Sequence, residues 1–124
     1  MFTDTLIDFY KVRDSNQPLK LAVKISNKVN ADSTIMLSRQ MIRGDGRDGS
    51  FAGSFELVLG MNKDLQGKEL RLTTLVHDIL STIKTTTLTV SLDGGGGRYI
   101  RTLDVEPSEN GGIITYSVSI RFYK

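Results

Sequence analysis

The sequence predicts an α+β domain in which a mostly antiparallel sheet packs against one long helix and a short N-terminal helix. Two patterns carry this prediction. Apolar residues recur at three- and four-residue spacing through Asp64–Ile83, as they do on the buried face of a helix. Elsewhere, short segments alternate apolar and polar residues, which is typical of strands with one buried face. The 124 residues contain no internal repeat and fit a single domain, residues 1–124.

The N-terminal segment Asp4–Arg13 fits either a short helix or a strand. Its apolar residues form a cluster made of Leu6, Ile7, Phe9, Tyr10 and Val12. A helix is favoured, because Thr3 or Asp4 can cap its start. Asp14–Pro18 is a run of turn formers, and Pro18 cannot continue a helix, so an element boundary is expected there.

Three strands are predicted in the first half of the chain. Leu19–Ile25 alternates apolar residues with lysine and alanine, and Thr34–Ile42 follows the turn signals of Ser26–Ser33. Arg43–Gly53 has four glycines in eleven residues and alternating charges, so we expect a mobile, exposed connection. Ser54–Gly60 alternates again, and we expect it to pair with the preceding strand as a hairpin with a long loop.

Asp64–Ile83 is predicted to be the long helix. Its apolar stripe consists of Leu65, Leu72, Leu75, Val76, Ile79, Leu80 and Ile83. Asn62 or Asp64 can cap the start, and Gly67 weakens the first turn. From Thr85 to Leu92 the sequence is rich in threonine, whose β-branched side chain favours a strand.

The chain is predicted to end in a long hairpin. Asp93 and the glycines Gly94–Gly97 form a second flexible connection, and the strands Tyr99–Val105 and Ile113–Phe122 follow, joined by Glu106–Gly112. In the last strand one face carries Ile114, Tyr116, Val118, Ile120 and Phe122. The opposite face is polar, so it is expected to contact water or another chain.

Composition and charge restrict the classes of function. Sixteen Lys and Arg residues are interspersed with fourteen Asp and Glu residues, and the formal net charge is +2. This mixing predicts a solvated surface rather than a continuous basic patch. The lack of cysteine excludes disulfides and thiolate metal sites and is compatible with a reducing compartment. Met1–Lys11 does not match a secretory signal, and no apolar stretch is long enough to span a membrane.

No cluster of residues predicts a reaction. His77, the single histidine, lies beside Asp78 in the predicted helix, and no second histidine follows at helical spacing. A metal site or a His–Asp catalytic relay needs partners that are missing, so a helix-surface or interface role is favoured. Neither glycine run fits a phosphate loop, because Gly94–Gly97 leads into a predicted strand rather than a helix and Arg43–Gly53 lacks the Gly-Lys-Ser/Thr ending. The sequence therefore predicts no enzyme activity, no cofactor and no metal.

Three segments in the second part of the chain suggest a family. They are Ser54–Gly60, Gly67–Leu80 and Tyr116–Lys124. Together they resemble the tail terminator or tail completion proteins of long-tailed bacteriophages, which are small α+β proteins that form a ring, typically a hexamer, at the head-proximal end of the tail tube. The resemblance implies a ring that ends tube polymerisation and joins the head connector. It also implies a place in the virion, in the tail or neck, after assembly in the host bacterial cytoplasm.

A ring subunit needs polar loops that order on contact and mixed charges that match between neighbours. We therefore predict a subunit or partner interface formed by the glycine-rich connections and the exposed face of the last strand. The predicted interface residues are Arg43, Asp45, Arg47, Asp48, Phe51, Arg98, Arg101 and Arg121. The predicted partners are other copies of this chain, the tail tube and the head–tail connector, and no membrane partner is predicted.

A small nucleic-acid-binding module with a basic sheet face is the alternative. Arginines near aromatic residues such as Phe51 and Tyr99 can follow a phosphate backbone. Asp45, Asp48 and Asp93 lie in the same stretches and cancel much of the positive potential. Direct nucleic-acid contact is therefore not favoured.

Overall fold

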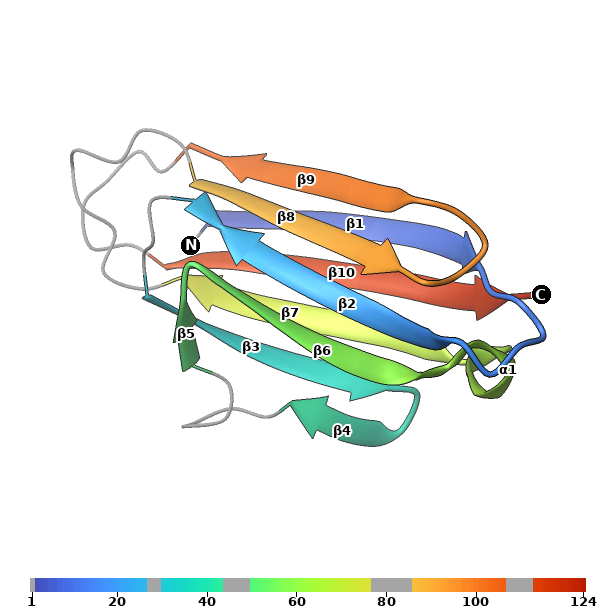
Figure 1. The fold of residues 1–124 in the computed structure, drawn as a ribbon. Helices are drawn as coiled ribbons and strands as arrows, with labels where there is room; N and C mark the ends of the chain where they lie inside the picture. The colour runs from blue at the N-terminus through green and yellow to red at the C-terminus, as the bar shows by residue number, and fades with distance from the viewer. Residues whose placement is uncertain (1, 27–29, 44–49, 77–85, 107–112) are drawn as a thin grey trace.

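The computed structural model is a sandwich of two β-sheets, so the predicted α+β class is wrong (Figure 1). The structure describes residues 2–26, 30–43, 50–76, 86–106 and 113–124. Within these ranges most residues belong to strands, and the α-helical part is the single turn α1 (Asn62–Leu65). A layer of side chains between the two sheets forms the core.

Sheet A places the first and last strands of the chain side by side. Its strands, in order, are β1 (Phe2–Lys11), β10 (Ile114–Tyr123), β7 (Glu69–Val76), β3 (Asn30–Leu37) and β4 (Gln40–Arg43), and β5 (Ser50–Ala52) also pairs with β3. The pair β1–β10 is parallel, with Phe2 opposite Ile114 and Lys11 opposite Tyr123. The other described pairs of this sheet are antiparallel.

Sheet B lies in front of sheet A in Figure 1 and is antiparallel throughout its described pairs. Its strands, in order, are β6 (Ser54–Met61), β2 (Pro18–Ile25), β8 (Thr86–Asp93) and β9 (Tyr99–Val105). These four strands and β10 lie where the sequence predicts strands, from alternation in β2, β6 and β10 and from β-branched threonines in β8. The core side chains of β2 and β10 are Leu19, Leu21, Val23, Ile25, Ile114, Tyr116, Val118, Ile120 and Phe122.

Most polar side chains inside the core have partners, whereas the Oγ1 hydroxyl of Thr86 has none among the described residues. The hydroxyls of Ser33 and Thr74, on neighbouring strands of sheet A, are 2.8 Å apart and share a hydrogen bond. The hydroxyl of Tyr116 donates to the carbonyl oxygen of Thr86 over 2.5 Å and so links the two sheets. Such pairing offsets most of the desolvation that buried polar groups suffer.

The predicted N-terminal helix at Asp4–Arg13 is wrong, and the strand alternative is correct. In β1, Leu6 and Tyr10 point towards the other sheet, whereas Ile7 and Phe9 point outward. Apolar residues therefore occupy both faces of the strand. A cluster of this kind has no clear period of two, which is why its sequence also fits a helix.

The predicted long helix at Asp64–Ile83 is wrong over its described part. The single turn α1 ends at Leu65, and β7 occupies the centre of sheet A with strands on both sides. Its buried side chains alternate strictly and are Leu70, Leu72, Thr74 and Val76. Leu72 and Val76 satisfy a helical spacing and a period of two at once, so the leucine-rich stripe was ambiguous. Residues 77–83 of the predicted helix lie outside the described residues.

The predicted strand Thr34–Ile42 is interrupted by a turn. Strand β3 ends at Leu37 and β4 begins at Gln40, and between them Ser38 has a φ of 54°. Strand β4 then folds back on β3. The proposed pairing of this segment with Ser54–Gly60 is wrong, because β6 pairs with β2 in the other sheet.

The predicted closing hairpin of Tyr99–Val105 and Ile113–Phe122 is also wrong. Strand β9 pairs with β8 in sheet B, whereas β10 pairs with β1 and β7 in sheet A. Both strands exist, but the chain changes sheet between them. Alternation identifies the buried face of a strand and leaves its neighbour undetermined.

Asn62 ties three connections together at one end of the sandwich. Its side chain is fully buried. The Nδ2 group donates to the carbonyl oxygens of Gln17 (2.7 Å) and Gly94 (2.9 Å), and Oδ1 accepts the backbone N–H of Arg13 over 3.0 Å. The β1–β2 connection, the start of α1 and the β8–β9 turn are thereby held by one amide, which makes three hydrogen bonds.

We predict that Asn62→Ala lowers the free energy of unfolding by about 3 kcal/mol, because it removes a fully buried amide and leaves three partly buried backbone groups without their partner. Urea unfolding followed by circular dichroism measures the loss. Asp64→Ala is the control, since Asp64 lies two residues away on the same turn and is exposed. Equal stabilities of the two variants would contradict the role of the Asn62 amide.

Candidate interaction surface

The predicted interface residues from the first glycine-rich connection cannot be placed as one site. Asp45, Arg47 and Asp48 lie outside the described residues. Arg43 and Phe51 belong to β4 and β5, which pair with successive parts of β3 at one edge of sheet A.

The remaining predicted residues lie on three separate surfaces. Arg98 lines a groove beside the β8–β9 turn, and Arg101 sits where β9 meets β1. Arg121 lies on the outer face of sheet A. Arg98, Arg101 and Arg121 therefore belong to different described contacts, and the nucleic-acid alternative stays a prediction.

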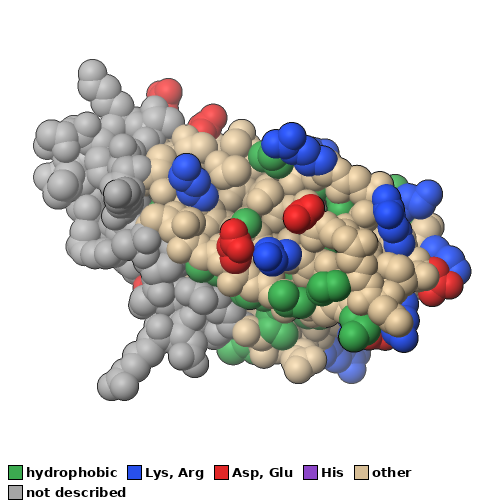
Figure 2. Space-filling model, viewed as in Figure 1, with side chains coloured by type: hydrophobic (Ala, Val, Ile, Leu, Met, Phe, Trp, Pro, Cys, Tyr) green, Lys and Arg blue, Asp and Glu red, His purple; other side chains and the backbone are tan. Residues whose placement is uncertain are grey.

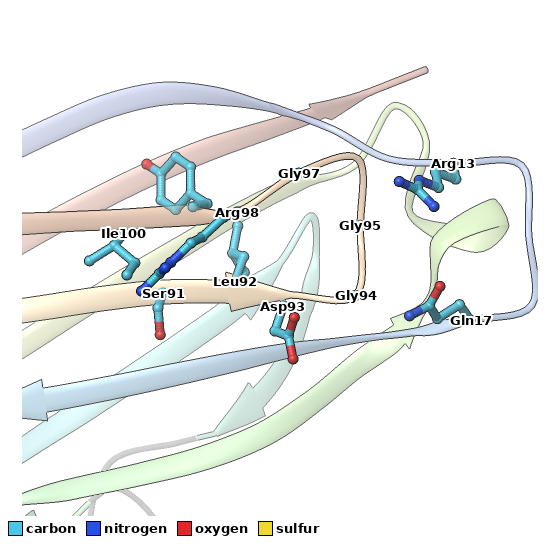
Figure 3. A pocket seen from close by; sticks show the side chains of 11 residues that line it. Arg13, Gln17, Ser91, Leu92, Asp93, Gly94, Gly95, Gly97, Arg98 and Ile100 are labelled. Atoms are coloured by element: carbon cyan, nitrogen blue, oxygen red, sulfur yellow. The ribbon is translucent and has the colours of Figure 1, made fainter.

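The groove beside the β8–β9 turn has a volume of about 460 Å³ (Figure 3). Arg13 and Gln17, from the β1–β2 connection, line the side opposite the glycine turn. Arg98 extends back towards Ser91 and away from Arg13. Because its two cations point to different places, the groove does not provide a convergent anion site, and we assign no ligand to it.

The turn Gly94–Gly97, which was predicted to be a flexible connection, is fixed by contacts. The N–H of Gly96 donates to the carbonyl oxygen of Lys11 over 3.0 Å, and the hydroxyl of Tyr10 donates to the carbonyl oxygen of Gly97 over 2.5 Å. Gly94 has a φ of +103°, and a Cβ atom there would lie 2.3 Å from the Pro18 carbonyl oxygen. The glycines let this turn approach β1 closely.

We predict that Gly94→Ala lowers the free energy of unfolding by about 2–3 kcal/mol, because the new methyl group meets backbone and the positive φ strains it. Gly97→Ala is the matched control, since a Cβ at Gly97 meets no heavy atom within 4 Å. That variant should stay within about 0.5 kcal/mol of the parent protein. Thermal unfolding of both variants measures the difference. A similar loss of stability in the two variants would contradict the close approach at Gly94.

A polar cluster closes the seam between β1 and β9, which lie against each other without pairing. One carboxylate oxygen of Asp8 accepts hydrogen bonds from the Tyr99 hydroxyl (2.8 Å) and from Nε of Arg101 (3.1 Å). The Arg101 guanidinium also lies 4.4 Å from the centre of the Tyr99 ring, and Tyr10 packs edge-on against that ring. Arg101 is therefore engaged inside its own chain.

The seam cluster shifts two pKa values. Burial acts to raise the pKa of Asp8, but the backbone N–H of Phe9 and the groups of Tyr99 and Arg101 outweigh it, and the net pKa is lowered from 3.8. Burial and the hydrogen bond to Asp8 raise the pKa of Tyr99. Asp8 therefore stays charged and Tyr99 stays protonated at neutral pH, which keeps the hydroxyl as the donor.

We predict that the seam cluster stabilises the fold above about pH 4 and loses this effect in acid. A carboxyl group with a lowered pKa in the folded state favours folding above its unfolded pKa, and protonation below that value removes the contribution. Asp8→Asn should therefore be less stable than the parent protein at pH 7, and the gap should narrow towards pH 3. Urea unfolding across this range measures it, with Asp93→Asn as the exposed-carboxylate control. A gap that stays constant with pH would contradict the assignment.

The outer face of β1 and β10 carries the two most exposed large apolar side chains of the described residues. Ile7 is 75% exposed and Phe9 is 61% exposed, at consecutive outward positions of β1. Tyr123, 48% exposed, follows diagonally on β10, because Phe9 lies opposite Arg121 in the register. We call these three exposed side chains, on the outer face of the β1–β10 pair, the apolar strip.

A shallow depression of about 210 Å³ adjoins this strip. Its lining consists of Ile7, Asp8, Phe9, Glu69, Ser119 and Arg121. The carboxylate of Glu69 forms an ion pair with Arg71, whereas Arg121 has no ion-pair partner among the described residues. We call Ile7, Phe9, Ser119, Arg121 and Tyr123 the outer patch.

Of the outer patch, the sequence predicted Arg121 and the exposed face of the last strand, and it missed Ile7 and Phe9. The predicted N-terminal helix would bury both side chains, because its apolar face would pack against the core. The available signal was the presence of apolar residues at odd and even positions of Asp4–Arg13. In an edge strand, that pattern leaves one apolar set in water.

Other kinds of site find no support in the described ranges. They contain no group of three or more His, Cys, Asp or Glu residues that could hold a metal ion. His77 lies outside them. The described part of the chain also has no helix that is long and apolar enough to cross a membrane.

Comparison with known proteins gave no match: no family model, no curated protein and no solved structure is significantly similar to this chain.

Proposed function

We propose that this protein is a structural assembly subunit that associates with further copies of itself through the outer patch. The observation that carries the proposal is the pair of highly exposed apolar side chains, Ile7 and Phe9, beside an arginine without an ion-pair partner in the described structure. Aromatic residues and arginine, grouped around a depression, are the typical centre of a protein–protein interface.

The shape and chemistry of the outer patch suit a protein surface better than a small ligand. The depression of about 210 Å³ is shallow and its apolar rim faces water. Burying Phe9 and Ile7 against a partner stabilises the complex by roughly 25 cal/mol for each Å² of apolar surface removed from water. Ser119 lies between Ile7 on β1 and Arg71 on β7 in the register. Its hydroxyl and the Arg121 guanidinium can form hydrogen bonds that fix the orientation of a partner.

The position of such an assembly at the end of a phage tail tube stays a prediction. The resemblance to tail terminators relied on a helix through Gly67–Leu80, and the described part of that segment contains β7. The proposal therefore keeps the assembly role and the self-association. A ring, its partners in the tail and its location in a virion are not needed for the test below.

We predict that Phe9→Glu lowers the average mass of the particles that the protein forms in solution, because it places a carboxylate in the centre of a contact that excludes water. Light scattering over a series of concentrations should show association weakened by at least about thirtyfold, the effect of losing an interface hot spot. Arg121→Ala should weaken it less, by about tenfold.

Ile100→Glu is the matched control for this experiment. Ile100 is a partly exposed apolar residue on an outward position of β9, in the other sheet. Its substitution should leave the mass unchanged. The proposal fails if the parent protein is monomeric at every concentration, or if Phe9→Glu and Ile100→Glu have the same effect.

A further inference from the structure

Sheet B ends at a long strand whose outer side pairs with no described strand. Among the described strands, β6 pairs with β2 only; it is eight residues long, contains no proline and has one charged side chain, Glu56. The free side of an edge strand presents backbone N–H and C=O groups that can receive another strand. We propose that β6 pairs antiparallel with β6 of a second copy, which joins two copies of sheet B into one continuous sheet.

The other edges of the sandwich are less suited to strand addition. At the far edge of sheet A, β4 and β5 have only four and three residues. The edges of β1 and β9 face each other at the seam, where Asp8 binds Tyr99 and Arg101. Short strands and mutual cover are common ways to protect an edge. Within the described structure, β6 has neither.

The side chains of β6 also leave apolar surface in water. Figure 2 shows hydrophobic side chains gathered along β6 on this face of the molecule. Val58 is 57% exposed and Met61 is 44% exposed, whereas Phe55 and Leu57 pack against the core and remain only half-buried. A strand added at this edge would cover apolar side chains and satisfy backbone groups at the same time.

The geometry of strand pairing restricts the register. Opposite residues of an antiparallel ladder point to the same face of the sheet. A two-fold symmetric pair of β6 strands therefore keeps its inward side chains inward when the symmetry axis passes through a residue, and that residue should lie near the middle of β6. With Leu57 at the centre, Glu56 lies opposite Val58 of the second copy. Lys20 is opposite Val58 on β2 and forms an ion pair with Glu56 of its own chain (3.8 Å), so each copy brings a Lys20–Glu56 pair to the junction. The two Glu56 carboxylates lie diagonally across the junction, and each has Lys20 of its own chain beside it, which is why we select a second β6 as the added strand.

The test uses Phe9→Glu as the background, because this variant removes the contact of the outer patch and leaves the β6 edge intact. The Phe9→Glu protein should be a dimer by light scattering at high concentration. Adding Val58→Glu should halve this mass, because the new carboxylate lies opposite Glu56 of the second copy. Adding Val58→Lys should retain the dimer, because the new ammonium lies opposite the same carboxylate.

Two controls separate strand pairing from misfolding and from other contacts. Thr102→Glu, on an exposed position of β9 in the same sheet, should leave the dimer intact. Circular-dichroism melting checks that the Val58 variants fold. Hydrogen exchange gives a second measurement, because amides of β6 should exchange at least about tenfold more slowly in the dimer than after dilution.

The outcomes distinguish this inference from the proposed function. A Phe9→Glu protein that is monomeric at every concentration, or one whose dimer survives Val58→Glu, overturns the pairing of β6. Loss of the dimer with both Val58→Glu and Val58→Lys overturns the register centred on Leu57. The proposed function is judged separately, by whether Phe9→Glu lowers the mass of the parent protein.

Discussion

The burial of every second side chain along the long strands is the constraint on which this structure depends. In β2, β7, β8 and β10 the inward set is apolar almost without exception, and each of these strands is flanked by others on both sides. One sheet cannot remove its apolar face from water alone, so two sheets must pack face to face. Ser33 and Thr74 enter the core as a hydrogen-bonded pair, whereas the Thr86 hydroxyl is buried without a partner among the described residues.

This constraint explains how much of the fold could be predicted from the sequence. Strands with a strict alternation, such as β2 and β10, were located correctly. The errors arose where the apolar residues fit two periods at once, in β7, or cover both faces, in β1. The pairing of strands could not be predicted from local sequence patterns. Consecutive strands such as β9 and β10 belong to different sheets, and tertiary contacts determine which strands become neighbours.

The candidate site was predicted in part for the same reason. The exposed face of the last strand, with Arg121, follows from the alternation of β10. Ile7 and Phe9 become visible as surface residues only when β1 is known to be an edge strand. Arg101 illustrates the opposite case: its charge suggested a partner in another molecule, and the structure gives it Asp8 of the same chain.

The parallel pairing of β1 with β10 has a mechanical consequence. The two strands are the first and last of the chain, and they run in the same direction, so the two termini lie at opposite ends of the sandwich (Figure 1). A force that pulls the termini apart acts along this pair, and it loads the hydrogen bonds of the ladder together rather than one after another. Separating the two termini therefore requires the β1–β10 ladder to yield in shear.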